Sequence, residues 1–141
     1  MEYTGVLVGL GNPGPRYEGT RHNCGFALVS ALLELADKEG GLSSLNGGKF
    51  SCELWRVRLS QLNGTWLAAM PQTFMNLSGQ CVQPLLAWHR LKPEQLVVAH
   101  DELDIPAGEL RFKRGGGNAG HNGLKSITEL PGTPDFYRLR L

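Results

Sequence analysis

Short apolar runs alternate along the chain with segments in which apolar residues recur every three or four positions. Two such runs, "GVLVGLGN" from Gly5 and "QLVVAHDELD" from Gln95, end in glycines or in charged residues, as buried strands do. The segment after the first run predicts a helix that ends at Gly40-Gly41. Its apolar positions at helical spacing are Phe26, Val29, Leu32, Leu33 and Ala36.

The middle of the chain predicts two antiparallel strands and a second helix. "KFSCELWRVRL" and "NGTWLAAM" are rich in strand-forming residues, and Asn63-Gly64 between them is typical of a two-residue hairpin turn. A helix capped by Asn76 or Ser78 follows and runs through Leu91. Pro84 within this segment predicts a kink or a late helix start.

The last third of the chain continues the alternation. "RFKRGGG" is a short basic strand before a glycine-rich loop, "GHNGLKSITEL" predicts a helix, and "FYRLRL" predicts a final strand. Alternating strands and helices indicate an α/β fold, and the hairpin makes its sheet mixed. We therefore expect residues 1–141 to form a single domain with a mixed, partly parallel central β-sheet flanked by helices.

Composition narrows the class of protein further. The 141 residues include 41% hydrophobic and 19% charged residues with a formal net charge of +1, as in an ordinary globular protein. Three cysteines without a CxxC pair (Cys24, Cys52 and Cys81) predict free thiols and a cytoplasmic location. Residues 59–89 lack acidic and basic side chains but contain prolines and amides, so we expect no membrane span and no membrane partner.

Two glycine motifs have the spacing of a dinucleotide-binding turn. Gly9-x-Gly11-x-x-Gly14 is interrupted by prolines and followed by polar residues, whereas a cofactor fold begins its helix within the motif. Gly115-x-Gly117-x-x-Gly120 follows a basic strand and fails in the same way. We therefore predict two sharp loops, no nucleotide cofactor and, without zinc-ligand spacing, no metal.

Polar residues follow the apolar runs where a sheet of this kind binds ligands, beyond the carboxyl ends of its strands. Asn12 follows the first run, Asn76 follows the hairpin, and Asp101 follows His100 after the later run. Strand alternation predicts that His100 points away from Asp101. The helical His89 is expected to be a surface or interface residue.

Four ordered blocks resemble the bacterial-type peptidyl-tRNA hydrolases. They are "GLGNPGPRYEGTRHNCGF", "TFMNLSG", "VVAHDELDIPAGELRFKRGGG" and "GHNGLKSI". This family cleaves the ester between a peptide and the 3′ ribose of tRNA and so recycles prematurely released peptidyl-tRNA. The resemblance implies that peptidyl-tRNA, a nucleic-acid substrate, is the partner of this chain.

The resemblance also implies roles for individual residues. His22 would be the base that activates water, Asp101 would orient it, and Asn12 would hold the water and the substrate. An ester needs no protein nucleophile for such an attack, and no serine here has the G-x-S-x-G context of one. Substrate-binding positions by resemblance are Tyr17, Met75, Asn76, His121 and Asn122. Each of three residues also has a purely structural alternative. His22 could be a loop histidine at a helix end, Asn12 could serve the geometry of a turn, and Met75 could belong to the core.

Binding of tRNA is expected at a local basic segment. Residues 111–127 contain no acidic side chain, and by resemblance Lys113 and Arg140 hold phosphate. Amides facing the substrate suit the neutral amide of a peptidyl group better than the charged amine of an aminoacyl group. A solvated strand face is the alternative for the basic segment, and a non-catalytic RNA-binding relative is the alternative for the whole chain.

The chain departs from the family pattern in two places. Ala119 stands where the family loop usually carries glycine, and the family continues beyond the last strand into a further strand and a helical region. We therefore expect residues 1–141 to be a domain truncated at the C-terminus. We expect the full-length form to be monomeric, whereas the truncated chain could self-associate through its uncovered surface.

Overall fold

The apolar runs form the centre of a seven-stranded sheet with the order β2-β3-β4-β1-β5-β7-β6. The structure, a computed structural model, describes residues 2–14, 20, 23–101, 111–115, 121–129 and 136–141. In this part of the chain the strands are β1 Gly5–Gly9, β2 Leu42–Leu45, β3 Cys52–Val57, β4 Trp66–Pro71, β5 Leu96–His100, β6 Arg111–Arg114 and β7 Tyr137–Arg140. The helices are α1 Cys24–Lys38, α2 Gly79–Trp88 and α3 Asn122–Glu129, with 3-10 turns η2 Gly48–Phe50, η3 Met75–Leu77 and η4 Pro93–Gln95.

The sheet is mixed, as the sequence predicts. Strands β4, β1, β5 and β7 run parallel, while β2, β3 and β6 are antiparallel to their neighbours. The carboxyl ends of the four parallel strands therefore meet at one edge of the sheet. This edge carries the candidate site.

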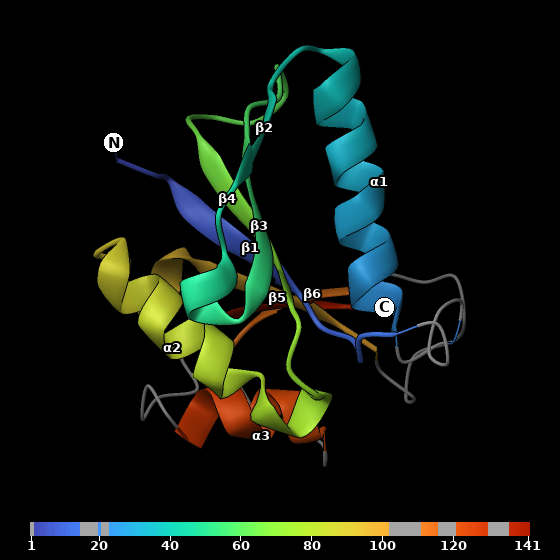
Figure 1. Cartoon of the computed structure of the whole chain (residues 1–141), viewed down its shortest axis with the longest axis vertical. Helices are drawn as coiled ribbons and strands as arrows, with labels where there is room; N and C mark the ends of the chain where they lie inside the picture. Colours follow the sequence, from blue (N-terminus) through green and yellow to red (C-terminus); the bar gives the residue numbers. More distant parts are fainter. Residues whose placement is uncertain (1, 15–19, 21–22, 102–110, 116–120, 130–135) are drawn as a thin grey trace.

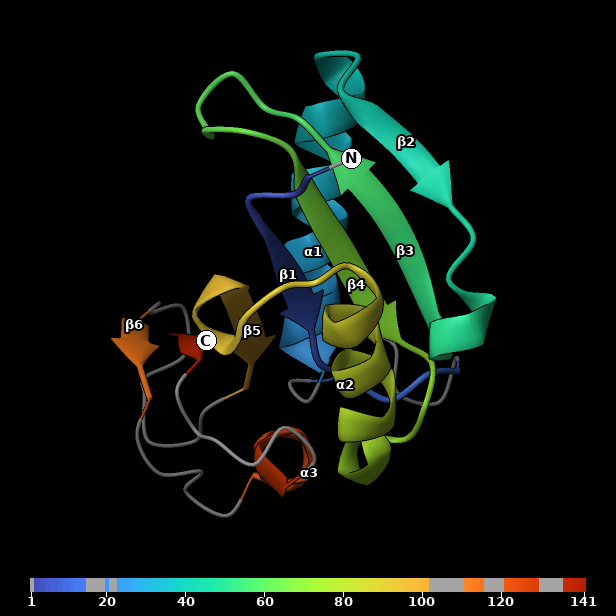
Figure 2. The same cartoon turned by 90° about the vertical axis from the view of Figure 1, so that its left-hand side faces the viewer.

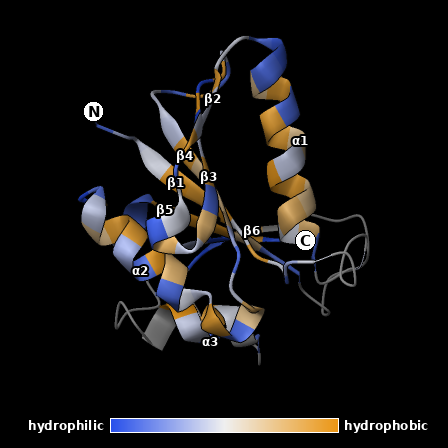
Figure 3. Cartoon of the chain, viewed as in Figure 1, coloured by the Kyte–Doolittle hydropathy of each residue, from blue (hydrophilic) through white to orange (hydrophobic). Residues whose placement is uncertain are grey.

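Helices cover both faces of the sheet (Figures 1 and 2). On one face, buried residues of α2 and α3 pack with Val6 and Val8 of β1, and on the other Val29 and Ala36 of α1 pack with Ala68 of β4. In Figure 3 the strands between the helices are largely coloured as hydrophobic, and hydrophobic and hydrophilic positions alternate along α1. Within the described residues, no helix is long and apolar enough to cross a membrane.

The start of α1 lies unusually close to the sheet. A Cβ at Gly25 would collide with backbone atoms of Leu10 and Ala99. Only glycine permits this approach of helix to strand. The glycine motif from Gly9 to Gly14 does not begin a helix, as predicted, since α1 begins only at Cys24.

The predicted hairpin turn is wrong, although the strands pair antiparallel as expected. The last registered pair is Val57 with Trp66, so residues 58–65 form the connection rather than Asn63-Gly64 alone. The Arg58 amide donates to the Gly41 carbonyl at 2.8 Å, next to the β2–β3 pair of Leu42 with Val57. Strand β2, which pairs with β3 at the sheet edge, was not predicted, because "LSSL" lacks strict alternation.

The second helix, α2, starts at Gly79, before Pro84, and ends at Trp88, before the predicted end at Leu91. It ends at Trp88 because Arg90 has a left-handed backbone with φ of 55°, so the predicted extension through Leu91 is wrong. Pro84 lies inside the helix rather than at its start. Its flanking residues Val82, Leu85 and Leu86 are buried, and their packing stabilises the helix despite the missing backbone donor.

Candidate functional site

Asn12 connects the loop after β1 with the turn after β4. The Met75 amide donates to Oδ1 of Asn12 at 2.7 Å. The backbone of Asn12 is held in turn by Asn23, whose Oδ1 accepts from the Asn12 amide at 2.9 Å and whose Nδ2 donates to the Asn12 carbonyl at 3.1 Å. In the part of the chain that the structure describes, the NH2 group of Asn12 has no hydrogen-bond partner. Asn12 is thus fixed in place with two donors unused.

Asp101, just after β5, and His121, just before α3, form a pair in which Asp101 is buried and His121 half-buried. Nε2 of His121 lies 2.8 Å from Oδ1 of Asp101, and the side chains are only 11% and 5% exposed. Nδ1 of the same ring accepts from the amides of Gly123 and Leu124 at 3.1 and 3.2 Å. An atom that accepts two N–H bonds carries no proton, so the neutral ring holds its proton on Nε2 and donates it to Asp101. His121 therefore orients Asp101 and caps the start of α3.

His100 does not point away from this pair, contrary to the alternation argument. Nδ1 of His100 lies 2.8 Å from the Asp101 carbonyl, and its ring makes an edge contact with the His121 ring at 5.1 Å between centroids. Alternation fails here because β5 ends at His100, so Asp101 lies outside the pleat. His89, by contrast, ends α2 and contacts the rings of Tyr3 and Phe50.

The two halves of the site meet at Gly123. A Cβ on this residue would lie 2.9 Å from both Leu10 Cδ1 and Met75 Cγ and 3.0 Å from Cε1 of His121. Met75 is half-buried against the core, whereas Asn76 is exposed on the adjacent position of η3. The glycine lets α3 pack directly against the loops that carry Asn12 and Asn76.

Strand register places Lys113 of β6 on the same face as Arg138 and Arg140 of β7. Lys113 is opposite Arg138, and Arg140 is opposite position 111. Directly opposed residues share a face, so Lys113 and Arg140 lie on the same side of the sheet. Lys113 is exposed and Arg140 half-buried. The shared role of the two residues in holding phosphate stays a prediction.

Arg138 differs from its basic neighbours because it is buried. It is 1% exposed, and its guanidinium carbon lies 4.5 Å from the centroid of the Phe136 ring. Burial lowers the pKa of Arg138 below its usual value, since desolvation disfavours the charged form. Arg138 belongs to the interior of this strand pair rather than to its exposed face.

Several expected site residues lie outside the described residues. They are His22 and Tyr17 in the first loop. Asn122 is the first residue of α3, but its side chain also lies outside the described part. The assignments of these residues remain predictions.

Two residues in the site escaped the sequence argument. Asn23 is 8% exposed and holds the Asn12 backbone, and its position beside His22 in the His-Asn pair was the available signal. Ser126 accepts a hydrogen bond from the Gly79 amide across two helices, a contact that no local pattern signals. No group of three or more metal-binding side chains occurs among the described residues.

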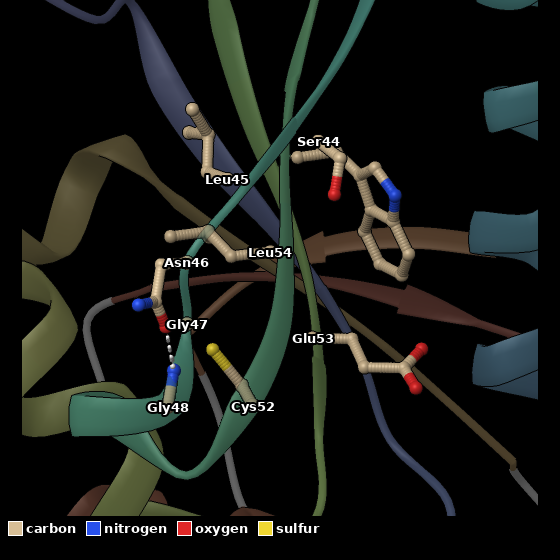
Figure 4. Close-up of a pocket in the computed structure, with 9 residues that line it drawn as sticks. Ser44, Leu45, Asn46, Gly47, Gly48, Cys52, Glu53 and Leu54 are labelled. Atoms are coloured by element: carbon tan, nitrogen blue, oxygen red, sulfur yellow. Dashed lines mark hydrogen bonds between the residues drawn. The ribbon is translucent and has the colours of Figure 1, made fainter.

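A separate hollow of about 500 Å³ lies beside β2 and β3 and contains none of the predicted site residues (Figure 4). Its lining consists of Ser44, Leu45, Asn46, Gly47, Gly48, Cys52, Glu53, Leu54 and Trp55.

Cys52 and Cys81 are buried free thiols, and Cys24 is a partly exposed one, as the cysteine pattern predicts. A hydrogen bond from the Cys81 thiol lowers the pKa of Cys52, and the same bond and burial raise the pKa of Cys81.

The fold and site together define an α/β protein with an amide, carboxylate and imidazole cluster at the carboxyl edge of a mixed sheet. The sequence profile of the peptidyl-tRNA hydrolase family matches residues 6–141. The chain belongs to the peptidyl-tRNA hydrolase family.

Individual relatives agree with this assignment. A peptidyl-tRNA hydrolase of Desulfovibrio desulfuricans is 77% identical over 141 residues, covering all of this chain and 62% of the relative. One from Nitratidesulfovibrio vulgaris is 59% identical over the whole chain and 71% of its own length. The crystal structure of the Acinetobacter baumannii enzyme superposes with a TM-score of 0.85 at 41% identity, covering 99% of this chain and 68% of that one. This chain therefore spans roughly two thirds of the length of these relatives.

Proposed function

We propose that this chain hydrolyses the ester between a peptide and the 3′ ribose of tRNA. The observation that carries the proposal is that two features lie at one sheet edge in a chain of this family: Asn12, whose NH2 group has no hydrogen-bond partner among the described residues, and the Asp101–His121 pair. The products are free tRNA and peptide, so the activity recycles prematurely released peptidyl-tRNA in the cytoplasm.

The proposed mechanism uses water rather than a protein nucleophile. His22 removes a proton from a water molecule, and Asp101 orients the imidazole and stabilises its charged form. An ionised carboxylate accepts hydrogen bonds at both oxygens, so the bond from His121 is compatible with this second role. The NH2 group of Asn12 is suited to hold the attacking water or the oxygen that becomes negative.

Substrate selection follows from the neutral side chains of the site. Met75, Asn76 and Asn122 are proposed to contact the peptide and the terminal nucleotide. A side-chain amide pairs with the amide of a peptidyl group, whereas it offers no counter-charge to the ammonium of an aminoacyl group. Tyr17 and His121 complete the proposed substrate-binding set, and Lys113 and Arg140 are proposed to hold tRNA phosphates.

One comparison tests the proposal directly. We expect release of tRNA from N-acetylaminoacyl-tRNA and much slower release from the matching aminoacyl-tRNA with a free amine. The variant His22→Ala should lower turnover about 100-fold or more, the usual worth of a positioned general base. Tight binding of N-acetylaminoacyl-tRNA without hydrolysis would instead assign the chain to a non-catalytic RNA-binding role.

A further inference from the structure

Helix α2 begins without a cap from its own N-cap residue. Ser78 occupies that position, but its backbone is helical with φ of −57° and ψ of −31°, and its side chain does not cap the helix. The Ser78 hydroxyl instead donates back to the Met75 carbonyl at 2.7 Å. The Cys81 amide bonds the Ser78 carbonyl at 3.1 Å, but the Gly79 amide at the first position of α2 needs an acceptor from elsewhere in the fold.

That acceptor is a serine of another helix. Oγ of Ser126 in α3 accepts from the amide of Gly79, the first residue of α2, at 2.9 Å. The neighbours of Ser126 anchor α3, since Leu124 and Ile127 are 2% and 0% exposed in the same core cluster as Cys81 and Val82 of α2. The hydroxyl is thus aimed at the start of α2 by packing on both sides.

The turn that carries Asn76 is consequently held at both ends. At its start, the Met75 amide donates to Oδ1 of Asn12, and after its end the Gly79 amide donates to Ser126. Asn76 lies between these anchors and is exposed. In the described part of the chain its side chain has no hydrogen-bond partner, so its place in the site depends on where the anchored backbone of the turn lies.

We propose that Ser126 is a positioning residue for Asn76. By binding the Gly79 amide, Ser126 couples α3 to the η3 turn and sets the place of the Asn76 amide in the substrate site. The role of Asn76 rests on the proposed function, whereas the coupling of Ser126 to the turn does not.

The test compares Ser126→Ala with variants that keep an acceptor. Ser126→Thr retains the hydroxyl on a half-buried side chain, and Ser126→Asp supplies a carboxylate, which is favourable at a helix N-terminus. Ser30→Ala, at an exposed serine of α1, is the matched control. Amide hydrogen exchange followed by NMR reports the anchor itself, and hydrolysis of N-acetylaminoacyl-tRNA reports its effect on the site.

In Ser126→Ala we expect faster exchange of the Gly79 amide and shifted NMR signals of the Asn76 side chain. The KM should rise about fivefold, the factor that one ordinary hydrogen bond supplies, with kcat changed less than twofold. Ser126→Thr or Ser126→Asp should restore both readouts, and Ser30→Ala should change neither.

The outcomes separate the two proposals. A wild-type chain without hydrolysis would overturn the proposed function, while the exchange of Gly79 and the signals of Asn76 would still test the anchor. Unchanged Gly79 exchange and Asn76 signals in a folded Ser126→Ala variant would overturn the inference. So would a KM that rises equally in Ser126→Ala and in both acceptor-retaining variants.

Discussion

Nε2 of His121 lies 2.8 Å from Oδ1 of Asp101, while Nδ1 of the same ring accepts from the first amides of α3. One imidazole therefore joins the end of β5 to the start of a helix that follows in the chain. A neutral ring with its proton on Nε2 satisfies both contacts at once. The site carboxylate and the helix start are thereby coupled.

Replacing His121 by alanine should destabilise the fold. The change removes both a helix cap and a partner of a buried carboxylate, which together are worth about 1–3 kcal/mol in the free energy of unfolding. His121→Asn keeps an oxygen acceptor for the α3 amides and should recover part of the loss. Urea denaturation measures the difference. Equal stability of wild type and His121→Ala would show that other contacts hold the start of α3.

Replacing Asp101 by asparagine should reduce turnover and leave substrate binding in place. Asparagine has the size of the carboxylate but would present the proposed base, His22, with a wrong tautomer and no charge. Single-turnover hydrolysis and filter binding of N-acetylaminoacyl-tRNA separate the two effects. Lost binding with normal turnover of bound substrate would make Asp101 a substrate ligand.

Lys113 and Arg138 are opposed on one sheet face but should respond differently to alanine. Lys113 is exposed, so Lys113→Ala should leave the melting temperature unchanged. It should lower the affinity for all tRNAs alike and make the salt dependence of that affinity shallower by about one phosphate contact. Lys38→Ala, at an exposed position of α1, is the control for loss of charge. A minimal substrate with only the terminal nucleotide should be affected less, and an equal loss would place Lys113 at the ester.

Arg138→Ala should act on stability instead. Its side chain is 1% exposed above Phe136, so truncation should cost about 2–4 kcal/mol in the free energy of unfolding. Chemical denaturation is the measurement. A variant that unfolds like wild type would mean that the interior of this strand pair tolerates the cavity.

Alkylation should distinguish the three thiols by exposure. Cys24 is partly exposed, whereas Cys52 and Cys81 are 7% and 0% exposed. The pKa of Cys52 is lowered by the Cys81 thiol, yet a buried sulfur cannot be reached by iodoacetamide. Mass spectrometry of the native protein should therefore find Cys24 modified first, with the other two modified after unfolding. Equal rates at Cys24 and Cys52 would show that thiolate character outweighs burial.

The elements that the sequence predicted correctly are those whose signal is local. The apolar run before Asn12, the helical spacing from Phe26 to Ala36 and the run before Asp101 each specify a strand or helix within a few residues. The parallel order of those strands also explains why the sequence alone indicates one sheet edge for Asn12, Asn76 and Asp101.

Only the tertiary structure decided the contacts between distant segments. A connection of residues 58–65 stands in place of the expected two-residue turn, and packing of α3 brought Ser126 to the start of α2. His121 meets Asp101 across 20 positions, and the end of β5 turns Asp101 out of the strand alternation. Residue patterns report the preferences of neighbouring positions, whereas these contacts depend on which surfaces are buried against one another, and that depends on the whole sheet.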